Sequence, residues 1–337
     1  FKQKTAYEIP KRDWSSDVCS SDLARSAATG TAPGAACRSG AHARGAGQHQ
    51  GQEAGGAPQG PGEGLDRICL VSERASVAFG MPLHNRAAFL PEALDSLLAQ
   101  SFRDFTIVMV DDGSTDNTER VALEYAARDT RLRYVRLPER RGMVGAWRAA
   151  FEQATQGGAR YFAWASDHDR WHPQWLATLA ASLDRHPAVV LVYPLTQRID
   201  PDGKPIDKPA RYFDTFGVTD VHARWTRMSR SDAVAAGDMV YGLMRVDAVK
   251  QAGVFRAVLC PDRLLIAELT LQGEIRQEPA VLWYRRQFAV GSINRQRSTL
   301  FAPGVTPPSR LTPAWYLHGR SLWKTYGDAG LALEIGR

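Results

Sequence analysis

The chain has 337 residues, with 42 Lys and Arg against 36 Asp and Glu and a formal net charge of +6. This excess is small and spread along the chain, so it suits an anionic nucleotide or an acidic membrane surface and argues against a nucleic-acid-binding protein. Four cysteines without a Cys-x-x-Cys pair argue against a disulfide framework and favour a cytoplasmic protein, and no apolar run approaches the roughly 18 residues that would cross a bilayer.

Two N-terminal segments lack the composition of a folded domain. Residues 1–23 resemble the in-frame translation of a sequencing-library adapter, and we exclude them from the fold as an artefact. Residues 24–72 are rich in Ala, Gly, Arg, Gln and Pro and carry few large apolar side chains. Such a segment cannot bury enough apolar surface to offset the entropy lost on folding, so we expect a disordered tail.

From residue 73 onward the expected elements alternate between strand and helix. Apolar runs predict strands at residues 76–80, 105–110, 132–137 and 161–165, and apolar side chains at helical spacing predict a helix after each strand. Repeated strand–helix units imply an α/β fold with a mostly parallel central sheet flanked by helices.

The pattern changes after another predicted strand at residues 189–193. The turn sequence Asp-Pro-Asp-Gly at residues 200–203 predicts a hairpin, a helix is expected to start near Asp262, and residues 281–284 resemble a strand. These elements predict a smaller extension of the sheet rather than a second copy of the first half.

Three parts therefore follow the tail: a first half at residues 73–200, an extension at residues 201–300 and a C-terminal helical segment at residues 301–337. The last part carries an amphipathic pattern, which we expect to pack on the domain as a lid rather than lie on a membrane surface. Its apolar positions are Trp315, Leu322, Trp323 and Tyr326.

Two acidic clusters follow predicted strands. Asp111 and Asp112 open an Asp-Asp-Gly-Ser-Thr-Asp segment, and Asp167-His168-Asp169 follows the strand at residues 161–165. Either cluster alone is ordinary turn or loop chemistry. However, the carboxyl ends of parallel strands meet at one edge of the sheet, where ligands bind, and carboxylates gathered there suit a divalent metal that holds phosphates.

This arrangement resembles the family-2 glycosyltransferases of the GT-A fold. The resemblance rests on residues 76–86, the Asp-Asp-Gly-Ser-Thr-Asp segment, residues 142–151 and Asp167-His168-Asp169. It implies a GT-A-like fold and an enzyme of the hexosyltransferase class, which moves a sugar with inversion from a nucleotide-diphosphate sugar to an acceptor hydroxyl. The implied acceptor is a saccharide or a lipid-linked molecule, as in the synthesis of cell-envelope polysaccharides, and peripheral contact with the inner membrane face is compatible with it.

The resemblance also implies roles for the two halves and for single residues. Residues 73–200 would bind the nucleotide sugar, and residues 201–300 would bind the acceptor. Mg²⁺ or Mn²⁺ would clamp the diphosphate with Asp169 as its ligand, and Asp262 would be the catalytic base. The residues implied in nucleotide-sugar binding are Pro82, His84, Asn85, Asp111, Asp112, Asp167, Arg285 and Arg286.

Three positions depart from the family pattern. His84 stands where Tyr or Thr is usual, Arg141 stands where Asn often precedes the glycine, and Ser166-Asp167-His168-Asp169 replaces a commoner Asp-x-Asp-Asp run. The first two leave the choice of nucleotide open, and the third leaves open which carboxylate holds the metal.

The roles expected in the second half have alternatives. Asp262 lies near a predicted helix start, so it is either the base or a simple N-cap, and Glu268 is a weaker substitute for the base. Arg285 and Arg286 follow a predicted strand, where they either grip the leaving diphosphate or remain solvated surface residues.

Other functions have weaker support. His168 and His172 have the spacing of two zinc ligands on a helix, but Pro173 and the lack of a His-Glu-x-x-His pattern argue against such a site. Trp171 is a candidate for stacking on a sugar. A sugar-phosphate nucleotidyltransferase would usually carry a glycine-rich loop after the first strand, which residues 81–86 lack. A non-catalytic nucleotide- or carbohydrate-binding protein of the same fold stays the alternative from another class.

Overall fold

The computed structural model describes residues 75–230, 236–288, 299–306, 308–309 and 312–326. The predictions for the adapter-like segment and the low-complexity tail concern residues 1–72, which lie outside the described residues. All the residues that are described belong to one compact unit of the chain.

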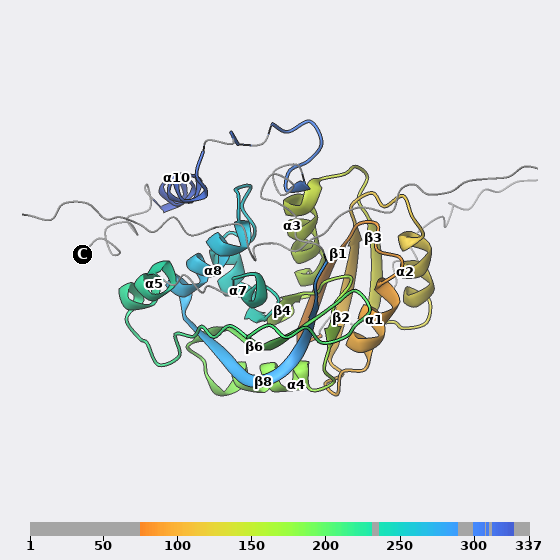
Figure 1. The fold of residues 1–337 in the computed structure, drawn as a ribbon, viewed down its shortest axis with the longest axis horizontal. Helices are drawn as coiled ribbons and strands as arrows, with labels where there is room; N and C mark the ends of the chain where they lie inside the picture. The colour runs from red at the N-terminus through yellow and green to blue at the C-terminus, as the bar shows by residue number, and fades with distance from the viewer. Residues whose placement is uncertain (1–74, 231–235, 289–298, 307, 310–311, 327–337) are drawn as a thin grey trace, which may run out of the picture. The chain divides into compact units, whose positions relative to one another are not determined.

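Eight strands form one sheet in the order β3-β2-β1-β4-β7-β6-β8-β5 (Figure 1). The strands are β1 (Val77–Leu83), β2 (Phe105–Asp111), β3 (Leu132–Arg136), β4 (Tyr161–Trp164), β5 (Arg170–Trp171), β6 (Val189–Ile199), β7 (Leu243–Arg245) and β8 (Glu274–Arg286). The pairs β3-β2, β2-β1, β1-β4 and β6-β8 are parallel, whereas β7 is antiparallel to β4 and β6, and β5 is antiparallel to β8.

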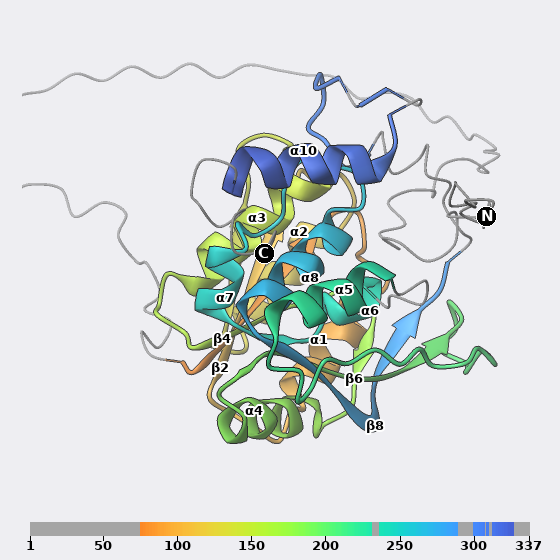
Figure 2. The ribbon, with the colours of Figure 1, turned by 90° about the vertical axis from the view of Figure 1, so that its left-hand side faces the viewer.

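Helices pack against both parts of this sheet. They are α1 (Leu90–Leu98), α2 (Thr118–Ala126), α3 (Gly142–Thr155), α4 (Trp175–Arg185), α5 (Val221–Arg230), α6 (Ala236–Met239), α7 (Val246–Gln251), α8 (Pro261–Gln272) and α10 (Ala314–Tyr326). Helix α3 contacts β1, β2 and β4, α4 contacts β6, β7 and β8, and α8 contacts β6 and β8. In Figure 2, α10 lies on the side of α8 and α3, and α4 lies at the opposite end of the view. None of the helices within the described residues is both long and apolar enough to cross a bilayer.

Strand β1 extends further than the sequence predicts. It continues through Pro82 to Leu83, because it stays paired with β2 up to Asp111. Strand β4 pairs only with the first part of β1, as far as Gly80. Pro82, which has no N–H to donate, therefore lies beyond the part of β1 that has neighbours on both sides.

Two glycines permit close approaches of helix α3. A Cβ at Gly80 would lie 2.9 Å from the backbone of Ala150, so β1 and α3 approach each other closely at this point. Gly142, at the start of α3, has a φ of +71°, and a Cβ there would lie 2.4 Å from the backbone of Phe301. Both the left-handed backbone and the lack of space require glycine at position 142.

An aromatic cluster joins the two expected halves. The ring of Trp147 on α3 lies 5.5 Å from that of Trp164 on β4, 4.8 Å from Phe255 and 5.4 Å from Tyr241, measured between ring centroids. Phe255 and Tyr241 come from the expected extension. The extension is therefore continuous with the core of the first half, and it brings its own side chains to the carboxyl ends of β1 and β4.

Candidate active site

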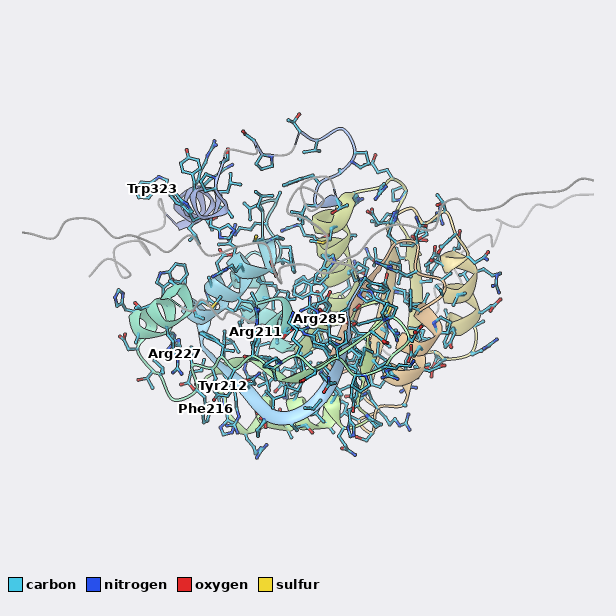
Figure 3. The ribbon with its side chains drawn as sticks, viewed as in Figure 1. Arg211, Tyr212, Phe216, Arg227, Arg285 and Trp323 are labelled. Atoms are coloured by element: carbon cyan, nitrogen blue, oxygen red, sulfur yellow. The ribbon has the colours of Figure 1, made fainter. Side chains whose placement is uncertain are left out.

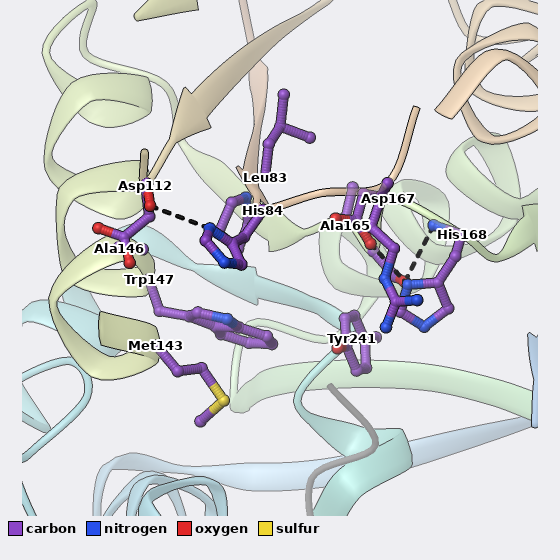
Figure 4. Close-up of a pocket in the computed structure, with 13 residues that line it drawn as sticks. Leu83, His84, Asp112, Met143, Ala146, Trp147, Ala165, Asp167, His168 and Tyr241 are labelled. Carbon is purple, nitrogen blue, oxygen red and sulfur yellow. Dashed lines mark hydrogen bonds and ion pairs between the residues drawn. The ribbon is translucent and has the colours of Figure 1, made fainter. Parts of the chain in front are cut away.

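A cleft of about 470 Å³, partly open to solvent, lies at the carboxyl ends of β1, β2 and β4 (Figure 4). The residues after these strands supply one part of its wall, including His84, Asp112 and Asp167. Met143 and Trp147 of α3 and Tyr241 of the extension supply the other. The sequence prediction that the two acidic clusters lie at one edge of the sheet is thus met by their positions in the fold.

Asp112 connects this cleft to the start of α3. Its Oδ1 accepts a hydrogen bond of 2.5 Å from the backbone N of Arg141, and its Oδ2 lies 4.0 Å from Nε of Arg140. Burial raises the pKa of the Asp112 carboxyl, while the N–H groups of Arg141 and Gly142 act in the opposite direction. A carboxylate at a helix N-terminus is favourable there, so α3 fixes this side chain in the cleft wall.

His84 is held in a defined tautomer. Its Nδ1 lies 3.0 Å from the carbonyl oxygen of Asp112, which can only accept, so Nδ1 carries the hydrogen. Nε2 is then the acceptor of the ring, and Nδ2 of Asn85 lies 3.5 Å from it. Burial, and then the charge of Arg140, lower the pKa of His84, so the ring is neutral at neutral pH. A donor group of a ligand could be recognised by this ring only by sharing or replacing the long contact from Asn85.

Asn85 and Asp111 have contacts that shape the loops behind the cleft, and neither lines it. Asn85 adopts a φ of +54°, and its Oδ1 accepts a 2.7 Å hydrogen bond from the N of Thr115. Asp111 accepts from the N of Ser114 at 2.8 Å and from the hydroxyl of Tyr134 at 2.8 Å. The direct nucleotide contacts expected of these two residues stay predictions.

Asp167 and Asp169 differ in their access to the cleft. Asp167 lines it, and its Oδ1 lies 2.6 Å from Nδ1 of His168. Asp169 is 1% exposed, does not line the cleft, and accepts a 2.7 Å hydrogen bond from the backbone N of Arg286. Burial raises the pKa of the Asp169 carboxyl.

The described residues contain no group of three or more His, Cys, Asp and Glu side chains placed to hold a metal ion. A magnesium-type site commonly uses one or two carboxylates together with substrate phosphates, so it does not require such a group. Asp167 fits such a role because its carboxylate is in the cleft wall, whereas the ligand role expected of Asp169 stays a prediction. The structure does not support the zinc alternative, because Nδ1 of His172 accepts a 3.2 Å hydrogen bond from the N of Gln174. Trp171, the candidate for sugar stacking, is buried in β5.

A second pocket of about 270 Å³ shares Met143, Trp147 and Tyr241 with the cleft. Asp262 and Arg285 also line this second pocket. Two residues that are distant in the sequence, and that we expected to act on the acceptor or the leaving group, are therefore brought beside the nucleotide-type cleft.

Asp262 is not the N-cap of its helix, contrary to the simpler alternative. The N-cap of α8 is Cys260, whose φ is +51°, and Asp262 is the second helical residue, 1% exposed. Glu268, the weaker candidate for the base, is fully buried and pairs with Arg256 at 2.6 Å. Glu268 lines neither of the two pockets described above.

The guanidinium groups of Arg285 and Arg286 have different partners. Nη1 of Arg285 lies 2.6 Å from Oδ1 of Asp238, and Nη2 of Arg198 lies 2.8 Å from Oδ2 of the same carboxylate. The guanidinium of Arg286 bonds to the carbonyl of His168 at 2.8 Å and pairs with Glu92. Both arginines are buried, so they are not solvated surface residues. Contact between either one and a diphosphate stays a prediction.

Sequence reasoning missed four residues here. Trp147 was expected only as a core residue of a helix, and Tyr241 and Asp238 carried no recognisable pattern. Arg86 lines the cleft, and its Nη2 is buried with no hydrogen-bond partner among the described residues. The one indication of this role in the sequence was the position of Arg86 in the loop after the first predicted strand.

Residues 79–236 match the family described as "Glycosyl transferase family 2". These residues form a family-2 glycosyltransferase domain. The match ends before Asp238 and Asp262, so the sheet extension that carries them is placed by the structure. The fold is GT-A-like, as the sequence predicts, with a central sheet flanked by helices.

Curated relatives agree with this family. The chain is 33% identical over 129 residues to TuaG, a putative teichuronic acid biosynthesis glycosyltransferase of Bacillus subtilis, covering 38% of this chain and 49% of TuaG. It is 33% identical over 97 residues to an uncharacterised glycosyltransferase of Rickettsia prowazekii, covering 29% of this chain and 28% of that protein. The chain thus spans less than half the length of each.

A solved structure shares the fold. The crystal structure of S. aureus TarS residues 1–349 in complex with UDP-GlcNAc has a TM-score of 0.50 and 16% identity to this chain, covering 65% of this chain and 60% of the TarS chain. At this identity the likeness concerns the fold.

Proposed function

We propose that this protein transfers a sugar from a nucleotide-diphosphate sugar to the hydroxyl of a saccharide or lipid-linked acceptor, with inversion at the anomeric carbon. The observation that carries the proposal is the pair of adjoining pockets. One contains Asp112, Asp167 and Arg86, and the other contains Asp262, with Trp147 and Tyr241 between them. A donor bound in the first pocket and an acceptor bound in the second would then be neighbours.

In this proposal the cleft binds the donor. Asp112 and the Nε2 acceptor of His84 contact the nucleoside, Pro82 borders it, and Asn85 and Asp111 keep the two loops in position. Arg86 is the guanidinium best placed for the diphosphate, because it lines the cleft and has a hydrogen-bond donor to offer. Arg285 and Arg286 would then stabilise the site indirectly, through their bonds to Asp238 and to the carbonyl of His168.

A divalent cation, Mg²⁺ or Mn²⁺, fits beside Asp167. The cation would be held by this carboxylate and by the donor phosphates, with Asp169 as the further ligand expected from the family resemblance. When bound, it would supply positive charge to the leaving diphosphate.

The transfer step requires a base on the acceptor side. The acceptor oxygen attacks the anomeric carbon, its proton passes to the Asp262 carboxylate, and the bond to the diphosphate oxygen breaks with its electron pair leaving on the diphosphate. Asp262 supports this role because it lines the second pocket and does not cap its own helix. TuaG, the putative teichuronic acid enzyme, supports a place in cell-envelope polysaccharide synthesis.

The test is release of nucleoside diphosphate from a panel of nucleotide sugars, with Mn²⁺ or Mg²⁺ and with a chelator. We expect cation-dependent release, and cation binding in the presence of nucleoside diphosphate that Asp167→Asn abolishes. The same measurement on Asp169→Asn decides whether this buried carboxylate is a ligand. Equal release with and without chelator would remove the cation from the proposal and leave Arg86 as the partner of the diphosphate.

A further inference from the structure

Helix α10 is attached to the domain through one of its faces. Ala314 and Leu317 pack against the hydrophobic core, and Nε2 of His318 lies 2.7 Å from the carbonyl oxygen of Leu259. Because a carbonyl can only accept, Nε2 carries the hydrogen of this bond. Burial lowers the pKa of His318, so the ring that makes the contact is neutral at neutral pH.

The opposite face of α10 exposes three aromatic side chains. Trp315 is 71% exposed, Tyr316 50% and Trp323 75%. Figure 3 shows Trp323 at the outer edge of the molecule, pointing away from the domain. By contrast, the tryptophans of the sheet and of α3 and α4 are buried, namely Trp147, Trp164, Trp171, Trp175 and Trp283. Packing of Trp315 and Trp323 as a lid, expected from the sequence, is therefore not what the structure shows.

Two cations lie beside these aromatic side chains. Arg320 and Lys324 are exposed, and residues 314–326 include no Asp or Glu. On a helix with 3.6 residues per turn, Tyr316, Arg320 and Trp323 lie within about 60° of one another, and Trp315 and Lys324 lie on the two flanks of this group. The result is an aromatic stripe with a positive border.

We propose that this outer face of α10 binds the surface of an anionic lipid bilayer. Trp and Tyr favour the headgroup region of a membrane, where the ring is partly in apolar and partly in polar surroundings. Phosphate groups of anionic lipids complement Arg320 and Lys324. Because only three rings and two charges take part, the attachment is weak, reversible and sensitive to salt.

A second copy of the chain is a poorer occupant of this face. A two-fold dimer would bring the same face of both copies together, so Arg320 and Lys324 would meet a helix with cations and no acidic residue. The face also presents no exposed Leu, Ile or Val to a protein partner: its exposed positions are Trp315, Tyr316, Gly319, Arg320, Trp323 and Lys324.

The attachment would place the second pocket near the bilayer. His318 of α10 holds the carbonyl of Leu259, three residues before Asp262, which lines that pocket. A lipid-linked acceptor would then reach the pocket from the surface on which α10 rests. The binding itself does not depend on the proposed transferase activity.

The test measures sedimentation of the full chain with vesicles of phosphatidylcholine mixed with phosphatidylglycerol, and with vesicles of phosphatidylcholine alone. We expect binding to the mixed vesicles that falls with added salt. The double variant Trp315→Ala/Trp323→Ala should lower the partition constant roughly tenfold or more. Tyr212→Ala is the matched control, because Tyr212 is 63% exposed and lies away from α10 in Figure 3, and it should bind like the unmodified chain.

The charges are tested separately. Arg320→Gln/Lys324→Gln should weaken binding to the mixed vesicles about fivefold for each charge and leave the weaker binding to phosphatidylcholine unchanged. The control variant Arg120→Gln/Arg128→Gln replaces two exposed arginines, one in α2 and one just after its C-terminal end. It changes the net charge equally and should have no effect of this size. An unchanged melting temperature and an unchanged circular dichroism spectrum show that each variant is folded.

Two results would overturn the proposal. In one, the tryptophan double variant binds vesicles as well as the unmodified chain does. In the other, the unmodified chain does not bind vesicles but self-associates, and the same variant is monomeric in sedimentation velocity, so that a second copy covers the face.

Discussion

The two halves of the sheet hold their buried carboxylates in different ways. In the first half, Asp111 and Asp112 accept hydrogen bonds from backbone N–H groups of nearby loops and of α3. In the extension, Asp238 lies between the guanidinium groups of Arg198 and Arg285, on β6 and β8. Loss of Asp112 leaves mainly a backbone N–H group without its acceptor, whereas loss of Asp238 leaves two buried guanidinium groups without a counter-charge. Loss of a carboxylate should therefore cost more stability in the extension than in the first half.

The largest expected effect is that of Asp238→Ala. All three side chains of the Arg198–Asp238–Arg285 cluster are at most 7% exposed, so the variant buries two positive charges without the carboxylate between them. Breaking a buried pair typically costs about 3–5 kcal/mol of unfolding free energy. Urea unfolding measures it, with the exposed Asp202→Ala as control, which should stay within about 0.5 kcal/mol. Equal stability of the two variants would contradict the comparison.

Next in size is the effect of Asp262→Asn on catalysis. A general base acts in the transition state, so we expect kcat to fall roughly 10²-fold or more with near-normal affinity for nucleoside diphosphate. Transfer rates and calorimetric binding on the same preparation measure both. Transfer at the unmodified rate would remove Asp262 from the chemistry, and Glu268 would not replace it easily because Arg256 already pairs with it.

Asp112→Asn should have the opposite profile. Asp112 lines the cleft proposed to bind the donor. The variant should therefore raise the dissociation constant of the donor roughly tenfold, the usual value of a hydrogen bond to a charged group, with a smaller change in kcat. An Asn can still accept from the N of Arg141, so α3 should keep its start and the melting temperature should change little. A fall in kcat alone would break the division between a binding half and a catalytic half.

The smallest expected effect concerns pH and His84. Burial lowers the pKa of His84 below 6.5, so the unfolded chain binds a proton more readily than the folded chain does. The contribution of this group to stability is thus complete above pH 6.5 and is lost as the pH falls from there toward the folded pKa. His84→Gln should reduce the difference in unfolding free energy between about pH 7.5 and about pH 5.5. An unchanged difference would mean that the pH dependence comes from other groups, His318 being the first candidate.

Much of the first half could be predicted from local patterns. The apolar runs at residues 105–110 and 161–165 became β2 and β4. The helix predicted after the strand at residues 132–137 became α3, which buries Trp147 and Phe151. The exact start of a helix was less accessible: the N-cap of α2 is Asn117, while the preceding Asp116 accepts a 2.9 Å hydrogen bond from the N of Thr118. Side-chain choices at a helix start depend on neighbouring loops, and a sequence pattern does not contain them.

The extension was harder to predict because its pairing is non-local. Strand β6 runs on to Ile199 beside β8, and β7 is inserted antiparallel between β4 and β6. Strand β7 has only three residues, too few for an alternating apolar pattern to be recognised in the sequence. Tyr241 and Asp238 precede this strand, so their roles in the pocket wall and in the ion-pair cluster depended on a strand that the sequence did not indicate.

The sequence by itself determined the alternation of strands and helices and the edge of the sheet where carboxylates gather, since both follow from residue periodicity and from the direction of parallel strands. It did not decide which carboxylate faces the ligand. Asp111 and Asp112 are adjacent, yet one is covered by Tyr134 and Arg136 and the other lines the cleft. That choice was made by the packing of β3 and α3 on either side of β2, because neighbouring side chains of an extended chain point in opposite directions and only the tertiary structure defines which side is open.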